Sequence, residues 1–220
     1  VSICGRDNRS SAGHAQSWQR TDSVVMGMTT SCGQDWRART VSLDANGFTL
    51  NKSRTPAAAT EIFYLALRGG NFKVGAFNQP TAVGNQIIGG IGFEPQVLFM
   101  SSFGRTASNT IAADSELSLG VTTGAGSRST AWAETRNVRP TVANVAAMTA
   151  KALRLANGPA AIRAEADIVG FGGNDLTLNW TTAAAPASQI VYWAAGGSKT
   201  ILGGGIDPPN AIIPPGAAAT

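Results

Sequence analysis

A pattern that repeats at a spacing of 128 residues is the feature of this sequence that most limits its fold. Residues 47–51 (GFTLN) match residues 175–179 (DLTLN), and a turn of small residues follows each of them. Residues 61–67 then match residues 189–195, and a pair of glycines closes each segment. From residue 24 to residue 67 the alignment needs no gap, and about a quarter of the paired residues are identical. This internal similarity predicts two copies of one structural unit.

The pattern inside each copy indicates β-strands. Residues 162–168 alternate between apolar and charged side chains, which predicts a strand with Arg163, Glu165 and Asp167 on its solvent side. Residues 61–67 and 189–195 are apolar on both faces, so we expect central strands that are covered on both sides. Gly, Ala, Ser and Thr are abundant and the charged content is low, which suits short strands joined by turns. The expected fold class is all-β, with two tandem antiparallel β-sandwich modules.

The first copy lacks a counterpart for the front of the second. Residues 1–5 resemble residues 117–120, but nothing in the first copy matches most of residues 72–120. We therefore expect residues 1–70 to be a partial module that lacks its N-terminal strands, and residues 71–205 to be a complete one. The missing strands are explained by residues that precede Val1 in the native protein, or by strands from another chain. An incomplete sandwich leaves an unpaired edge, which invites strand addition.

Three further segments carry structural expectations. Residues 206–220 contain four prolines and are expected to form an extended arm, either loose or anchored on a neighbouring subunit through Ile206, Ile212 and Ile213. Residues 141–155 have a weak helical stripe, but their place in the repeat predicts a loop or one short turn. Trp180 and Trp193 lie on expected central strands and are predicted core residues.

Candidate interface residues are the remaining tryptophans and two arginines near one of them, because exposed Trp and Arg are enriched at binding interfaces. These residues are Trp18, Trp36, Arg37, Arg39 and Trp132. Cys4 and Cys32 can form a single disulfide or remain two buried thiols, and the sequence leaves both open.

No catalytic, cofactor or metal site is expected. The single histidine, His14, lies in a Ser- and Gly-rich stretch, and two cysteines with one histidine do not make a zinc site. Glu165 and Asp167 alternate along one strand, where solubility explains them better than glycosidase chemistry. The net charge of +4 comes from scattered residues, so a nucleic-acid partner is not expected. The apolar runs are too short to cross a bilayer, so no membrane partner is expected either.

The second copy resembles a recurring β-sandwich module of phage and prophage structural proteins. The resemblance rests on the order of six short motifs: residues 72–77 (FKVGAF), 81–86 (TAVGNQ), 90–95 (GIGFEP), 164–167 (AEAD), 176–181 (LTLNWT) and 190–197 (IVYWAAGG). It implies a non-enzymatic component of a tail, a fibre or a capsid surface, located in a virion or another extracellular particle. Its implied partners are other copies of the chain and other virion proteins.

A weaker likeness is to the H-type lectin fold. Residues 92–97 (GFEPQV), 176–180 and 190–195 follow the strand order of that fold. This likeness implies a second function, the binding of a host surface glycan at an oligomer edge. No set of sugar-contacting residues carries over to this sequence.

Overall fold

The computed structural model of the chain is built from β-strands. It describes residues 2–5, 15–20, 22–29, 33–55, 59, 61–67, 69–104, 106, 109, 111–134, 143–148, 150–157 and 161–197. Every regular element in these ranges is a strand, and every strand pair is antiparallel. The all-β prediction is therefore confirmed.

The strands, in chain order, are β1 (Ser2–Gly5), β2 (Ala15–Trp18), β3 (Val25–Met28), β4 (Gln34–Asp44), β5 (Gly47–Arg54), β6 (Asn71–Asn78), β7 (Gly84–Gly89), β8 (Pro95–Ser102), β9 (Ile111–Ala113), β10 (Ser115–Thr122), β11 (Ser127–Glu134), β12 (Ala143–Met148), β13 (Leu153–Asn157), β14 (Ala161–Phe171), β15 (Asp175–Thr182) and β16 (Gln189–Gly196).

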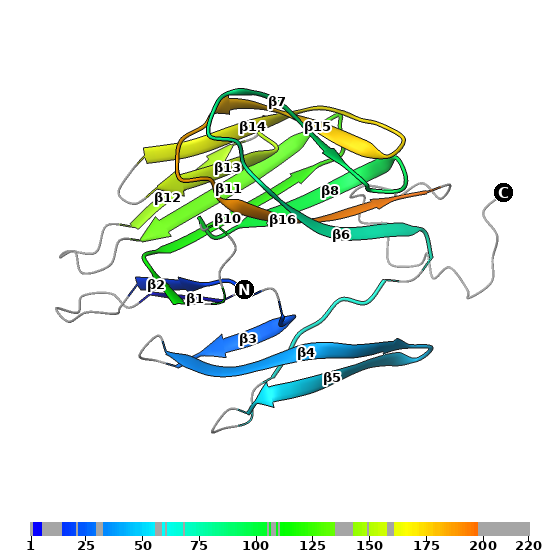
Figure 1. The fold of residues 1–220 in the computed structure, drawn as a ribbon, viewed down its shortest axis with the longest axis vertical. Helices are drawn as coiled ribbons and strands as arrows, with labels where there is room; N and C mark the ends of the chain where they lie inside the picture. Colours follow the sequence, from blue (N-terminus) through cyan, green and yellow to red (C-terminus); the bar gives the residue numbers. More distant parts are fainter. Residues whose placement is uncertain are drawn as a thin grey trace, which may run out of the picture.

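Strands β6 to β8 and β10 to β16 form a two-layer sandwich. A six-stranded sheet of order β12-β11-β10-β8-β16-β6 lies over a four-stranded sheet of order β13-β14-β15-β7 (Figure 1). Alternate residues of each strand point between the sheets, as period-two patterning requires. Leu98 and Ile190 contribute to the core from one sheet, and Leu176, Leu178 and Trp180 from the other. Trp180 is 1% exposed, which confirms its predicted place in the core.

The three-stranded sheet β3-β4-β5 repeats the pairing of β13-β14-β15 with the spacing of 128 residues. Val25 pairs with Ala38 in the first sheet, and Leu153 pairs with Ala166 in the second. Even the β-bulges fall at equivalent positions. The register shifts lie between Gly27 and Met28, Arg37 and Ala38, and Thr40 and Ser42 in one sheet, and between Leu155 and Ala156, Glu165 and Ala166, and Ile168 and Gly170 in the other. The sequence repeat therefore corresponds to a repeated sheet with the same irregularities.

A small fourth sheet connects the two parts. The β1–β2 hairpin pairs with β9, which belongs to the connection between β8 and β10 of the sandwich. Figure 1 shows this hairpin between the sandwich and the β3-β4-β5 sheet.

The prediction of a central strand at residues 61–67 is wrong. This segment contains no strand, and Phe63, Tyr64 and Leu65 are exposed. Its counterpart β16 lies between β6 and β8, as a central strand should. The described residues around 61–67 include no equivalents of those two neighbours, so the segment has no ladder to join.

Two expectations for the second copy also need correction. Residues 141–155 were expected to form a loop or turn, but they contain β12, which adds to the edge of β11, and the start of β13. Arg163 was expected on the solvent side, but it is buried. Leu155 pairs with Ala164 and Ala156 with Ile162, so Arg163 is the extra residue of a β-bulge that turns it inward. Glu165 and Asp167 do lie outward, partly exposed.

Candidate functional site: an outer apolar face

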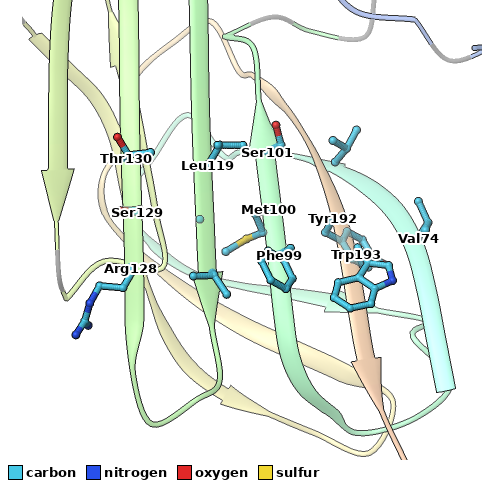
Figure 2. Close-up of a pocket in the computed structure, with 13 residues that line it drawn as sticks. Val74, Phe99, Met100, Ser101, Leu119, Arg128, Ser129, Thr130, Tyr192 and Trp193 are labelled. Atoms are coloured by element: carbon cyan, nitrogen blue, oxygen red, sulfur yellow. The ribbon is translucent and has the colours of Figure 1, made fainter. Parts of the chain in front are cut away.

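The outer surface of the six-stranded sheet carries a row of side chains at matched positions on five neighbouring strands. From β6 to β11 the row is Val74, Trp193, Phe99, Val121 and Arg128, each paired in register with the next. Figure 2 shows Val74, Trp193, Phe99 and Arg128 along this row. Residues that pair directly across neighbouring strands point to the same side of a sheet, so these side chains share one face.

A second row lies beside the first. It runs through Val191, Ser101, Leu119 and Thr130, which also pair in register. The two rows line a depression with a volume of about 690 Å³. We call these two rows the outer apolar face.

The aromatic side chains of this face support one another. The Trp193 ring stacks on Phe72 at 5.9 Å with an interplanar angle of 15°, and it lies 5.3 Å from the ring of Phe99. Val74 is 73% exposed and Phe99 is 47% exposed. A contiguous apolar patch on a folded protein marks an interaction site, whereas single exposed apolar residues do not.

Trp193 was predicted to lie in the core, and this prediction is wrong. Strand β16 is apolar on both faces, which suggested a cover on both sides. Ile190 and Tyr192 do face the core, and burial raises the pKa of Tyr192 above its ordinary value. Val191 and Trp193 face outward, where no described residue covers them fully. The two-sided pattern of β16 was the sequence signal for this face.

Trp132, another candidate interface residue, belongs to the same sheet as this face. It stands on β11 two positions after Thr130, hence on the same side of the sheet, and it is half-buried. Its role as an interface residue stays a prediction.

Trp18 and Trp36 are buried within the chain rather than presented to another molecule. Trp18 is 2% exposed, and its Nε1 donates to the carbonyl of Asn109 at 3.3 Å. The Arg20 guanidinium lies 5.3 Å from its ring. Trp36 is 6% exposed, and its indole lies so close to Gly27 that no Cβ fits there. Trp18 therefore joins the first part of the chain to the sandwich, because Asn109 belongs to the sandwich's connection between β8 and β10.

Arg37 and Arg39 stand on β4. Arg37 donates to the Ser53 hydroxyl at 2.9 Å and lies 3.9 Å from the Asp22 carboxylate. The Arg20 guanidinium, bonded to the same carboxyl at 2.6 Å, holds the pKa of Asp22 well below its usual range. Arg39 is exposed. These positions leave the predicted interface role of the two arginines open.

Most of the remaining candidate residues lie outside the residues that the structure describes. Cys4 is on β1, while Cys32, Ile206, Ile212, Ile213 and His14 lie outside the described residues, as does the arm at 206–220. The disulfide and the anchoring arm stay predictions. Among the residues that the structure describes, no group of three or more His, Cys, Asp or Glu side chains could hold a metal ion. These residues also include no helix that is long and apolar enough to cross a membrane.

Comparison with protein-family models, curated proteins and solved structures finds no match to this chain.

Proposed function

We propose that this chain is a non-enzymatic structural protein of a phage-like particle, which acts by packing β-sandwich modules against neighbouring subunits. The observation that carries the proposal is the outer apolar face. Val74, Trp193 and Phe99 lie side by side in one row, in which Val74 and Phe99 are exposed and Trp193 is partly exposed, and Arg128 is the last residue of the row. Aromatic residues and arginine are enriched at protein interfaces, and covering this row removes apolar surface from water.

The particle context is supported by the ordered motifs of residues 72–197, which resemble modules of phage and prophage structural proteins. Such proteins work by repeated contacts between identical subunits. The outer apolar face suits that role because its strands are already paired, so little backbone freedom is lost when the face is covered.

Binding of a host surface glycan is the second candidate, and Trp193 is the observation that favours it. A tryptophan flanked by Phe72 and Phe99 is a platform on which a sugar ring can stack. Sugars also need several hydrogen-bonding groups beside the platform, and the outer apolar face offers few, mainly Ser101, Thr130 and Arg128. The balance favours a protein partner.

Sedimentation velocity of the full chain over a range of concentrations tests the first proposal. We expect concentration-dependent association that is lost in the double variant Trp193→Ser/Phe99→Ser. The matched control is Val169→Ser, an exposed apolar residue on the four-stranded sheet, which should associate like the parent chain. A chain that stays monomeric at every concentration contradicts packing through this face. Glycan-array binding that depends on Trp193 would replace the proposal with the second candidate.

A further inference from the structure

Among the strands that the structure describes, β5 lacks a neighbour that its counterpart has. In the sandwich, β15 pairs with β14 on one side and with β7 on the other, where Leu176 is opposite Ile88. Strand β5 pairs with β4, and no other described strand lies along its second edge. The β4–β5 and β14–β15 hairpins share the same register and bulges. A strand that pairs with the second edge of β5 should therefore adopt the register that β7 has on β15.

The segment 61–67 lacks two neighbours in the same way within the described part of the chain. Its counterpart β16 lies between β6 and β8. The segment already lies over β5, since the Tyr64 ring contacts Phe48 edge-to-face at 4.8 Å. Yet Tyr64 is 71% exposed, whereas its counterpart Tyr192 is 6% exposed.

Among the described strands, the β1–β2 hairpin also has an edge without a paired neighbour. It takes the place of β10–β11, because β1 contacts β3 as β10 contacts β13; β1 also contacts β10, but no ladder joins the two. Strand β10 pairs with β11 on one side and β8 on the other, but β1 pairs only with β2 among the described strands. The neighbours that these places lack among the described strands therefore correspond to β6, β7 and β8, which are consecutive in the chain.

We propose that the first module binds a polypeptide segment with the strand pattern of residues 71–102. Its β7-type strand adds to the edge of β5, and its β6-type and β8-type strands add on either side of residues 61–67. Unpaired strand edges bind other strands in this way because each addition satisfies backbone donors and acceptors. Docking would bury Phe48, Leu50 and Tyr64 as Leu176, Leu178 and Tyr192 are buried in the sandwich.

Residues 71–102 of a second copy are not the expected donor. In each copy these strands already pair with β10, β15 and β16, and removing them would open the sandwich core. The occupant is therefore a further segment of this pattern from outside residues 1–220.

One residue that differs between the two copies gives the binding site on the first module its own specificity. Trp180 is buried and its Nε1 donates to the Gln86 side-chain oxygen at 2.9 Å. Its counterpart is Lys52, which is exposed. When a docked segment covers this edge, the Lys52 ammonium group favours a carboxylate over an amide beside it. The segment that binds the first module should therefore carry an acidic residue at the position of Gln86.

The test adds a separate polypeptide of residues 71–102 to the full chain and measures backbone hydrogen exchange. We expect slower exchange at residues 47–52 and 61–67, and at least several-fold tighter binding when the added segment carries Gln86→Glu. Fusing the segment ahead of Val1 through a flexible linker raises its effective concentration and provides a second form of the same test. A segment of the same composition in scrambled order should protect neither region.

Paired variants separate docking from misfolding. Leu50→Glu places a charge on the inward side of β5 and should abolish protection by the segment. Asn51→Glu, one position along on the outward side, should leave it unchanged. Exchange at the β4–β5 pairing without the segment shows whether either variant disturbs the hairpin itself.

No protection from either the separate or the fused segment overturns the proposal, and so does equal protection from the scrambled one. Equal binding of segments with Gln or Glu at position 86 overturns the assigned specificity. The result is independent of the outer apolar face, because Trp193→Ser should leave segment binding intact and Leu50→Glu should leave association through that face intact.

Discussion

Tyr64 and Tyr192 stand at equivalent positions of the repeat, but Tyr64 is 71% exposed and Tyr192 is 6% exposed. Tyr64 contacts Phe48 of β5, and Tyr192 shares the sandwich core with Leu176, the counterpart of Phe48. The residues on either side of the two tyrosines are similar. The difference in exposure comes from the neighbouring strands, because β6 and β8 lie on either side of the strand that carries Tyr192.

Tyr192 should ionise only at unusually high pH. Burial disfavours the phenolate, so the pKa of Tyr192 in the folded chain lies above the ordinary value of 10.0. Because the folded pKa is the higher one, this contribution to stability is complete below pH 10 and is lost as the pH rises through the folded pKa. The chain has two tyrosines, so Tyr64→Phe leaves Tyr192 as the only phenol, and ultraviolet absorbance follows its titration. The same titration in denaturant is the control, and coincident curves would contradict the prediction.

Gly120→Ala should destabilise the sandwich. A Cβ on Gly120 of β10 would lie 2.0 Å from the backbone oxygen of Ala152, next to β13 in the facing sheet. Backbone cannot move aside as a flexible side chain can, so we expect a loss of about 1–3 kcal/mol in the free energy of unfolding, as for other overpacked cores. Gly126→Ala is the matched control, because a Cβ there meets nothing within 4 Å. Chemical denaturation measures both, and equal stability of the two variants would show that the sheets can separate without cost.

The sequence predicted the strands of the repeat better than their surroundings. The alignment of residues 24–55 with residues 152–183 anticipated the equivalence of β4–β5 and β14–β15, because the turn residues and apolar positions are local signals. The burial of Arg163 could not be predicted in this way, since a bulge shifts the alternation by one position. The exposure of Trp193 and of residues 61–67 depends on which strands and sheets lie beside them, and an apolar pattern does not specify its neighbours.

Arg163→Met should destabilise the sandwich strongly. Arg163 and Glu116 form an ion pair at 3.0 Å, with both side chains almost fully buried, and Arg163 also donates to the Ser188 hydroxyl at 2.6 Å. Removing the cation breaks a buried ion pair, which typically costs about 3–5 kcal/mol. The double variant Arg163→Met/Glu116→Leu should recover part of this loss, because it removes the buried carboxylate together with the cation.

Lys151→Met is the control for the buried pair. Lys151 and Asp167 also lie 2.9 Å apart, but Asp167 is partly exposed, so this pair should contribute only about 0–1 kcal/mol. If both single variants lose the same free energy in denaturant unfolding, burial is not what makes the Arg163 pair important.

Trp18→Ala should loosen the attachment of the first part of the chain to the sandwich. Trp18 is buried and pairs with Ile111 of β9, and its Nε1 donates to the Asn109 carbonyl. Its neighbour Gln19 donates to the side chain of Gln189 at the start of β16, so this corner joins strands that are far apart in sequence. Truncating a buried tryptophan costs about 3–5 kcal/mol in the free energy of unfolding. A sheet of three short strands has little stability of its own, so we expect this loss to open it.

Hydrogen exchange should report this loss as faster exchange in β2 and β9, while β15 in the sandwich core keeps its protection. Trp18→Phe is the conservative comparison. It keeps an apolar ring but removes the N–H donor and part of the buried ring, so we expect a loss at the same strands that is smaller than that of Trp18→Ala. If Trp18→Ala instead speeds exchange in β15 as much as in β2, the two parts unfold as one cooperative unit, and the small sheet is not a separable connection between them.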